Sequence, residues 1–490
     1  MRIIIALVLG LGLLFSSVSA SAETQVKFSG FYKVFHENDV NFLRAANSSY
    51  RDSESFFWHR LQLTVDFIAN EDVTVRWVTR GPNTVRWGSV PYGDARGAGS
   101  LDLFTRAIYA AVNTDYGQFV IGRHNGSMVG NIAGLETLGY KQKFGDFLNL
   151  HVFDWALPHD GLSYSKKWEN GFGLNVVMVK ERSTASLTEK DTDADRFGIE
   201  PYFLWETGGA GVEVSYIRDK TPQKAYTTPP PDPAYTYPVD KNWTIAINPS
   251  FFQSWGNFAI HFEGKLAWGE TVYRRRADGA PELSDNKVKN QGLGFYLDGV
   301  YNYGPGQITV GGWYFDGNSP QEGGGPRPGR EKGHDLVWAG NFAPFLVAYG
   351  ASIGLGAGGA VNVLGDGKRT SPSKYTVGNH WAIGILGDHD VTKDIRLHYG
   401  LGFFRAVNPW GRHLARIVNG RRILADNSKD LGYEIDLGVA VKLLNNLTWE
   451  SHLGYFVNGD AYNTFDDNVP GSGQKAKDTY AWANALIFTF

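Results

Sequence analysis

The last twelve residues of the chain, 479–490, alternate bulky apolar side chains with small ones. One face carries the bulky set and the other the small set: Tyr480, Trp482, Leu486, Phe488 and Phe490 against Ala481, Ala483, Ala485 and Thr489. A period of two is the mark of a β-strand, and about ten residues suffice for a tilted strand to cross a bilayer. The segment therefore predicts a membrane-crossing strand with one apolar face.

The same alternation recurs in pairs of segments joined by short turns. Residues 60–67 alternate apolar with polar side chains, and the chain turns and returns through 73–77. Late segments place Glu450 and His452 on a polar face in the same way. Eight turn signals rich in Asn, Asp and Gly mark such hairpins: 70–72, 115–117, 169–171, 208–209, 255–257, 304–306, 388–394 and 445–446. With an opening strand at 25–36 and the closing strand, they predict about 18 antiparallel strands, and roughly 16 to 20 stay open.

The connections of the other parity are all long, such as 81–102, 125–160 and 317–375. A transmembrane barrel has short periplasmic turns and long extracellular loops. A soluble β-sandwich also alternates, but it leaves the regular succession of short and long connections unexplained. We therefore expect residues 23–490 to form one all-β, transmembrane antiparallel barrel.

The composition agrees with membrane crossing by strands. The chain is 42% hydrophobic and 14% aromatic with 60 Gly, and beyond residue 22 no long unbroken apolar stretch remains. A barrel hides its hydrophobicity by alternation, so the sequence carries no helical span. The absence of Cys excludes disulfides, thiolate metal sites and Cys nucleophiles.

Residues 1–22 have the pattern of a signal peptide. Arg2 precedes an apolar run over 3–15, and Ala20-Ser21-Ala22 follows as a small-residue cleavage site. An N-terminal anchor needs about 20 apolar residues, which is longer than this run. We expect export of the chain and cleavage after residue 22.

Two hairpins resemble those of Gram-negative outer-membrane porins. Residues 106–123 are similar to the porin hairpin that ends in a Gly-Arg pair before the third loop, and residues 160–175 resemble the hairpin that follows this loop. The closing strand is similar to that of outer-membrane barrels, in which the terminal aromatic, here Phe490, is read by the barrel assembly machinery. Residues 431–461 show a weaker likeness to alginate-export-type barrels, which are 18-stranded anion channels.

The resemblance implies an outer-membrane location and a water-filled channel for passive diffusion of small hydrophilic solutes and ions, with no enzymatic activity. Outer-membrane lipid, lipopolysaccharide and the assembly machinery are the implied partners. Porins of this kind are usually homotrimers, whereas alginate-export-like barrels act alone. Two further functions stay open: a substrate-specific channel for an anionic sugar or polysaccharide, and a barrel that sheathes a periplasmic partner.

The resemblance also implies a third loop, 125–160, that folds into the lumen and faces a basic wall. Arg60 and Arg76 lie on strand faces opposite the apolar sets, and further arginines lie near the same rim. Opposed charges across a narrow aqueous gap select ions. The predicted constriction residues are Arg60, Arg76, Arg80, Arg106 and Arg123 on the wall and Glu136, Asp146 and Asp154 on the loop. Arg123 shares parity with Ile121 unless a bulge intervenes, so its side is ambiguous.

Other motifs carry no chemistry. Ser352 fits G-x-S-x-G and residues 354–359 fit G-x-G-x-x-G, but a Gly-rich stretch follows where each motif requires a helix. The acidic run 189–195 lacks the order of a calcium loop. The net charge of −3 does not provide the positive electrostatic potential that attracts nucleic acid. We expect no cofactor, no metal site and no nucleic-acid partner.

Overall fold

A computed structural model describes most of the strands of this protein. The described residues are 24–40, 53–86, 104–125, 158–182, 194–219, 239–273, 287–317, 379–408, 428–460 and 478–490, with short strands at 223–225, 235–237, 329–332, 337–338, 376–377, 415–418, 421–424, 464–465 and 473–474. The predicted signal peptide and the third loop from 126 to 157 lie outside these residues.

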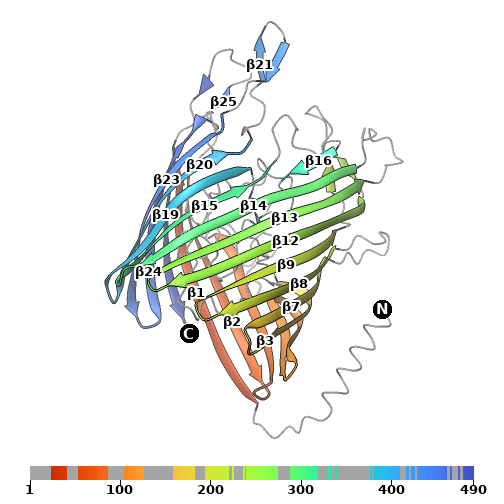
Figure 1. Ribbon diagram of the computed structural model, residues 1–490. Coiled ribbons are helices and arrows are strands. Elements are labelled where there is room, and N and C mark those ends of the chain that lie inside the picture. Colours follow the sequence, from red (N-terminus) through yellow and green to blue (C-terminus); the bar gives the residue numbers. More distant parts are fainter. Residues whose placement is uncertain are drawn as a thin grey trace, which may run out of the picture.

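The described strands close into an antiparallel barrel of 18 strands (Figure 1). They are β1 (Gln25–Val40), β2 (Ser53–Ile68), β3 (Val73–Arg86), β4 (Phe104–Thr114), β5 (Gly117–Asn125), β6 (Pro158–Lys167), β7 (Phe172–Arg182), β8 (Ala194–Trp205), β9 (Gly208–Asp219), β12 (Val239–Trp255), β13 (Phe258–Tyr273), β14 (Lys287–Asn302), β15 (Gly306–Phe315), β19 (His380–Thr392), β20 (Ile395–Ala406), β23 (Asp430–Leu444), β24 (Leu447–Asn458) and β27 (Thr479–Thr489). A further short strand, β16 (Gly329–Lys332), pairs parallel with β14. The prediction of about 18 strands is confirmed.

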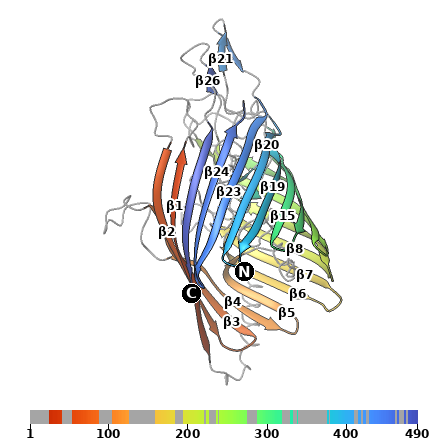
Figure 2. The ribbon, with the colours of Figure 1, turned by 90° about the vertical axis from the view of Figure 1, so that its left-hand side faces the viewer.

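The barrel closes where the first and last strands meet (Figure 2). β1 pairs with β2 on one side and with β27 on the other. Beyond β27, the backbone N–H of Phe490 donates to the carbonyl of Gly30 at 3.1 Å, and the Gly30 N–H donates back at 2.8 Å. The alternating segment that ends the chain is therefore the closing strand, as its pattern predicts.

Short turns join the strands at one end of the barrel. The turns predicted at 70–72, 169–171 and 445–446 lie wholly in these connections. Those predicted at 115–117, 255–257 and 304–306 overlap the connections, but Gly117, Trp255 and Gly306 are strand residues. Of the predicted 388–394, only 393–394 form the connection, because β19 extends to Thr392. The turn between β8 and β9 falls at Glu206 and Thr207, just before the predicted Gly208. Gly208 is instead a strand residue, because it pairs with Trp205 and Gln253.

Each strand presents one apolar and one polar face, and β8 shows the division clearly. Its outward Phe197, Ile199 and Phe203 are 44%, 46% and 46% exposed, whereas the inward Arg196 and Glu200 are 1% and 0% exposed. An apolar outer face around a polar interior is the arrangement of a barrel that stands in lipid. We call these outward side chains of the barrel strands the outer apolar belt.

The inner face also carries aromatic residues toward the long-loop end. Trp313, Phe315, Phe404 and Phe456 are 2% exposed or less, and the Phe404 and Phe456 rings stack with centroids 5.7 Å apart. Trp313 donates its indole N–H to His380 at 3.2 Å. Among the described residues, no helix is long and apolar enough to cross a membrane.

Candidate pore wall

The inner face of β1 to β4 gathers four cationic side chains, which we call the basic arc: Lys33, Arg60, Arg80 and Arg106. Lys33 is the direct cross-strand neighbour of Arg60, and Arg80 is the neighbour of Gln62. Arg80 donates to the Gln62 Oε1 from Nη2 at 2.9 Å and from Nε at 3.2 Å. The three arginines lie close enough to repel one another, and Lys33 feels the field of Arg60 and Arg80. The arc concentrates four cationic side chains on one side of the interior.

A β-bulge between β3 and β4 brings Arg106 into the arc. The register runs from Val78 opposite Ala107 to Thr79 opposite Thr105, which leaves Arg106 as the extra residue. Simple alternation does not assign such a residue to either face, because a bulge re-aims the side chain. Arg106 lies within electrostatic reach of Arg60 and Arg80, which face the interior.

Arg76 also faces inward, but its charge is compensated. Its Nε and Nη2 donate to the two carboxylate oxygens of Asp66 at 2.6 and 2.9 Å. A bidentate pair of this kind holds both groups in one orientation. Arg76 therefore adds little net field to the arc, although it lies on the face that its alternation predicts.

The structure places Arg123 on the outer face, away from the arc. Arg123 is the cross-strand neighbour of Ile108, and it shares a face with Ile121, which is 49% exposed. Its Nε lies 3.6 Å from Asp160 Oδ1, and both side chains are largely exposed. The bulge that could have turned Arg123 inward is absent from the pairing of β4 with β5. The prediction that Arg123 lines the lumen is not supported by this position.

Of the other predicted residues, the structure describes Phe490 but not the three acids of the third loop. Glu136, Asp146 and Asp154 belong to the third loop and lie outside the described residues. Phe490 lies on the outer face with its ring 5.9 Å from that of Phe488, and it is 50% exposed. Its role in assembly stays a prediction.

A cluster of acids and histidines continues the wall beside the arc. Glu450 on β24 lies within electrostatic reach of Lys33 and of His398. His398 Nδ1 lies 2.6 Å from Asp388 Oδ1, and the His398 ring stacks on that of His452 with centroids 5.3 Å apart. Gly438 permits the stack, because a Cβ there would lie 2.3 Å from His452 Nδ1. No group of side chains among the described residues is arranged to hold a metal ion.

The inner face of β7 to β14 carries buried, hydrogen-bonded ion pairs. Arg196 Nη2 donates to Glu213 at 2.5 Å, and Asn248 donates to the same carboxylate at 2.8 Å. Asn175 donates to Glu200 at 2.8 Å. Buried charges persist only when paired and hydrogen-bonded, because removing them from water is costly. We call this region the ion-paired wall.

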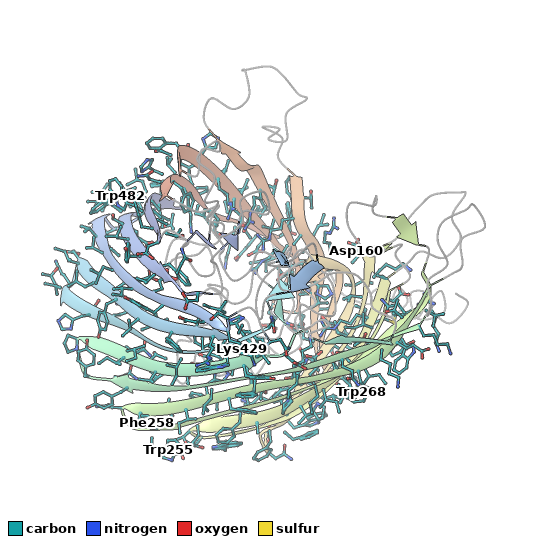
Figure 3. All side chains as sticks on the ribbon, turned by 90° about the horizontal axis from the view of Figure 1, so that it is seen from above. Asp160, Trp255, Phe258, Trp268, Lys429 and Trp482 are labelled. Atoms are coloured by element: carbon teal, nitrogen blue, oxygen red, sulfur yellow. The ribbon has the colours of Figure 1, made fainter. Side chains whose placement is uncertain are left out.

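Carboxylates outnumber cations on the ion-paired wall. Its buried charged side chains are Arg196, Lys265, Glu200, Glu213, Glu263 and Asp298. Viewed down the barrel, the green strands β12 to β14 lie across the interior from the red and orange strands β1 to β3 (Figure 3). Among the described residues, the cationic basic arc therefore lies across the interior from a wall with more buried carboxylates than buried cations.

Comparison with known proteins rests on structure, since neither a family model nor a curated protein matches the chain. OpdL from Pseudomonas aeruginosa superposes with a TM-score of 0.50 at 9% sequence identity, over 95% of this chain and 99% of that one. This chain has the fold of OpdL.

Two other solved structures match over similar lengths. The outer membrane protein OpdK from Pseudomonas aeruginosa matches at a TM-score of 0.47 and 10% identity, covering 95% of this chain and 99% of its own. An anion-selective porin from Comamonas acidovorans matches at 0.43 and 9%, covering 96% and 100%.

Proposed function

We propose that this protein is an outer-membrane channel through which small hydrophilic solutes diffuse passively, with a preference for anions. The basic arc carries the proposal. Its arginines face the interior and lie close enough to repel one another. A cluster of cations on a water-filled wall attracts anions and repels cations.

The outer surface supports placement in a membrane. The turn at Glu206 lies at the short-turn end of β8, and a charged rim lies at its long-loop end. In this rim Asp195 Oδ2 accepts from Arg218 Nη2 at 2.5 Å, and Asp195 Oδ1 lies 3.1 Å from Lys180 Nζ. These ion pairs form a charged rim at the long-loop end of the belt. Such a rim suits the anionic headgroups of outer-membrane lipid, including lipopolysaccharide.

The size of the preference follows from Coulomb's law. A cation about 8 Å from a passing ion contributes roughly 0.5 kcal/mol in water, and screening at 0.1 M salt about halves this. Three arginines therefore supply about 0.7 kcal/mol, attractive for an anion and repulsive for a cation. The difference of about 1.4 kcal/mol corresponds to roughly a tenfold ratio of permeabilities.

Single-channel recording in planar bilayers tests the proposal. The wild-type protein is compared with the Arg60→Gln/Arg80→Gln/Arg106→Gln variant and with Arg123→Gln, an outward arginine that serves as the matched control. We expect open, ohmic channels whose anion preference falls toward unity in the triple variant and persists in the control. Equal selectivity of the triple variant and wild type would refute the role of the arc.

A substrate-specific channel for an anionic sugar is the second candidate, and the concentration of the arginines at one place favours it. Close cations make a site that holds a carboxylate longer than free diffusion does. If the channel has such a site, we expect glucuronate to block the chloride current of the wild type saturably and glucose not to block it. A block that rises linearly with glucuronate concentration would favour the general channel.

A further inference from the structure

Two histidines on the inner face stack on each other, although their strands are not paired. We call them the histidine pair: His398 on β20 and His452 on β24. Both are direct cross-strand neighbours of Gly438 on β23, the strand between them, and Figure 2 shows the three strands side by side. The two rings lie with their centroids 5.3 Å apart. A Cβ at position 438 would collide with the His452 ring, so the glycine allows the pair to form.

A carboxylate lies at each end of the histidine pair. Asp388 on β19 is the direct neighbour of His398, and its Oδ1 lies 2.6 Å from His398 Nδ1. Glu450 precedes His452 by two residues on β24, and its Oε2 lies 4.0 Å from His452 Nε2. Both nitrogens of a protonated imidazole donate, and a carboxylate only accepts. The four side chains therefore form a row in which each ring has an acceptor for the proton that it gains.

Glu450 connects the histidine pair to the basic arc across the closing strand. Its cross-strand neighbour on β27 is Ala485, a small residue that is 1% exposed. Lys33 on the next strand, β1, lies within electrostatic reach of Glu450, which in turn lies within reach of His398. Lys33 is also within reach of two arginines of the arc, Arg60 and Arg80. The charge of Glu450 therefore opposes the nearest cation of the arc.

The strands around the histidine pair carry other charged groups on their inner faces. β27 adds none beside His452, because its inner residues there are alanines. Between β19 and β20, near their short turn, Asp390 Oδ1 lies 2.5 Å from Arg396 Nε. Further charged residues on the inner faces of β23 and β1 are Glu434, Asp436, Lys442, Lys33 and Glu37. Any of these groups that titrates does so with or without the histidines, so a variant that lacks the pair separates the two contributions.

We propose that the histidine pair is a specificity-determining site of the channel, and that protons bound by His398 and His452 strengthen its preference for anions. Imidazole changes its charge between about pH 5 and 8. An imidazolium beside Glu450 offsets the carboxylate charge, so the attraction of Lys33 and the arginines for anions is less opposed. Two stacked imidazolium rings repel each other, so the pair takes up its protons in separate steps. The proposal rests on the proposed channel function, because it concerns the charge of the same lumen.

The expected size of the effect follows from the estimate for the basic arc. There, three cations give roughly a tenfold ratio of anion to cation permeability. Each proton adds one positive charge to the same wall, so it multiplies this ratio by about two. Acidification that adds the first proton therefore raises the ratio about twofold, and acidification that adds both raises it about fivefold.

Zero-current potentials across a KCl gradient, recorded at pH 8 and at pH 5, test the proposal. The wild type is compared with His398→Gln/His452→Gln, with each single variant, and with His36→Gln as the matched control. The ring of His36 lies on the outer face, 5.7 Å from that of Trp482, which points away from the barrel in Figure 3. We expect the ratio of chloride to potassium permeability to rise about two- to fivefold on acidification in the wild type and the control, and by less in the single variants and least in the double variant. An equal rise in the double variant and the wild type, or no rise in the wild type, would overturn the proposal.

A further variant tests the connection through Glu450. Glu450→Gln removes one negative charge beside Lys33, and we expect its anion preference at pH 8 to be about twofold above that of the wild type. An unchanged preference at pH 8 would contradict this connection. The same recordings distinguish the two proposals: a wild type without anion preference at pH 8 refutes the proposed function, whereas an anion preference that is equal at pH 5 and pH 8 refutes only the role of the histidine pair.

Discussion

Removal of the charge of Glu213 is expected to destabilise the barrel strongly. Glu213 is 0% exposed, and it accepts from Arg196 at 2.5 Å and from Asn248 at 2.8 Å. Glu213→Gln keeps the shape and a polar contact, but it removes the carboxylate charge that pairs with the buried Arg196 guanidinium. Removing one partner of a buried ion pair costs about 3 to 5 kcal/mol. Arg196→Met/Glu213→Leu removes both charges, and we expect a change of less than about 2 kcal/mol for this double variant.

Asp195→Asn is the matched control. Asp195 lies next to Arg196 on β8, but the side chains of its partners Lys180 and Arg218 are 40% and 36% exposed. Exposed pairs contribute at most about 1 kcal/mol each. The free energy of unfolding of the three variants and of the wild type is measured by urea unfolding of the refolded proteins in vesicles. The fluorescence of the 15 tryptophans reports the transition. A cost below about 1 kcal/mol for Glu213→Gln, or an equal cost for the double variant, would refute this account of the ion-paired wall.

Two further predictions concern packing and assembly. Gly438→Ala places a Cβ 2.3 Å from His452 Nδ1, so we expect loss of the His398–His452 stack and a cost of about 1 to 3 kcal/mol in urea unfolding; an unchanged midpoint would contradict the close contact. Phe490→Ala removes the predicted assembly signal, and we expect less folded protein in cell envelopes, measured by heat-modifiable mobility on gels, while refolding of the purified chain in detergent proceeds. Wild-type yield in envelopes would argue against this role.

The strands and turns could be predicted from the sequence because their signals are local. Alternation sets the face of each side chain, and Asn, Asp and Gly set the turns. The same rule places Arg60, Arg76, Glu450 and His452 on the inner face, as observed. It places Arg123 outside once the pairing of β4 with β5 is known to be regular.

The pairing of charges across strands could not be predicted, because it depends on register. Arg196 and Glu213 lie on neighbouring strands, and nothing in either segment alone indicates that they meet. The bulge at Arg106 is likewise a property of two strands together. Asn484 and His36, on the last and first strands, become neighbours only when the barrel closes.

The central claim, an open channel with a preference for anions, is tested most directly by the zero-current potential of the wild-type protein across a KCl gradient. The basic arc predicts a potential of the sign for chloride permeation, with roughly a tenfold preference near 0.1 M that falls toward unity near 1 M as the Debye length shrinks to about 3 Å. A potential of the sign for potassium permeation, or the absence of conductance, would contradict the account.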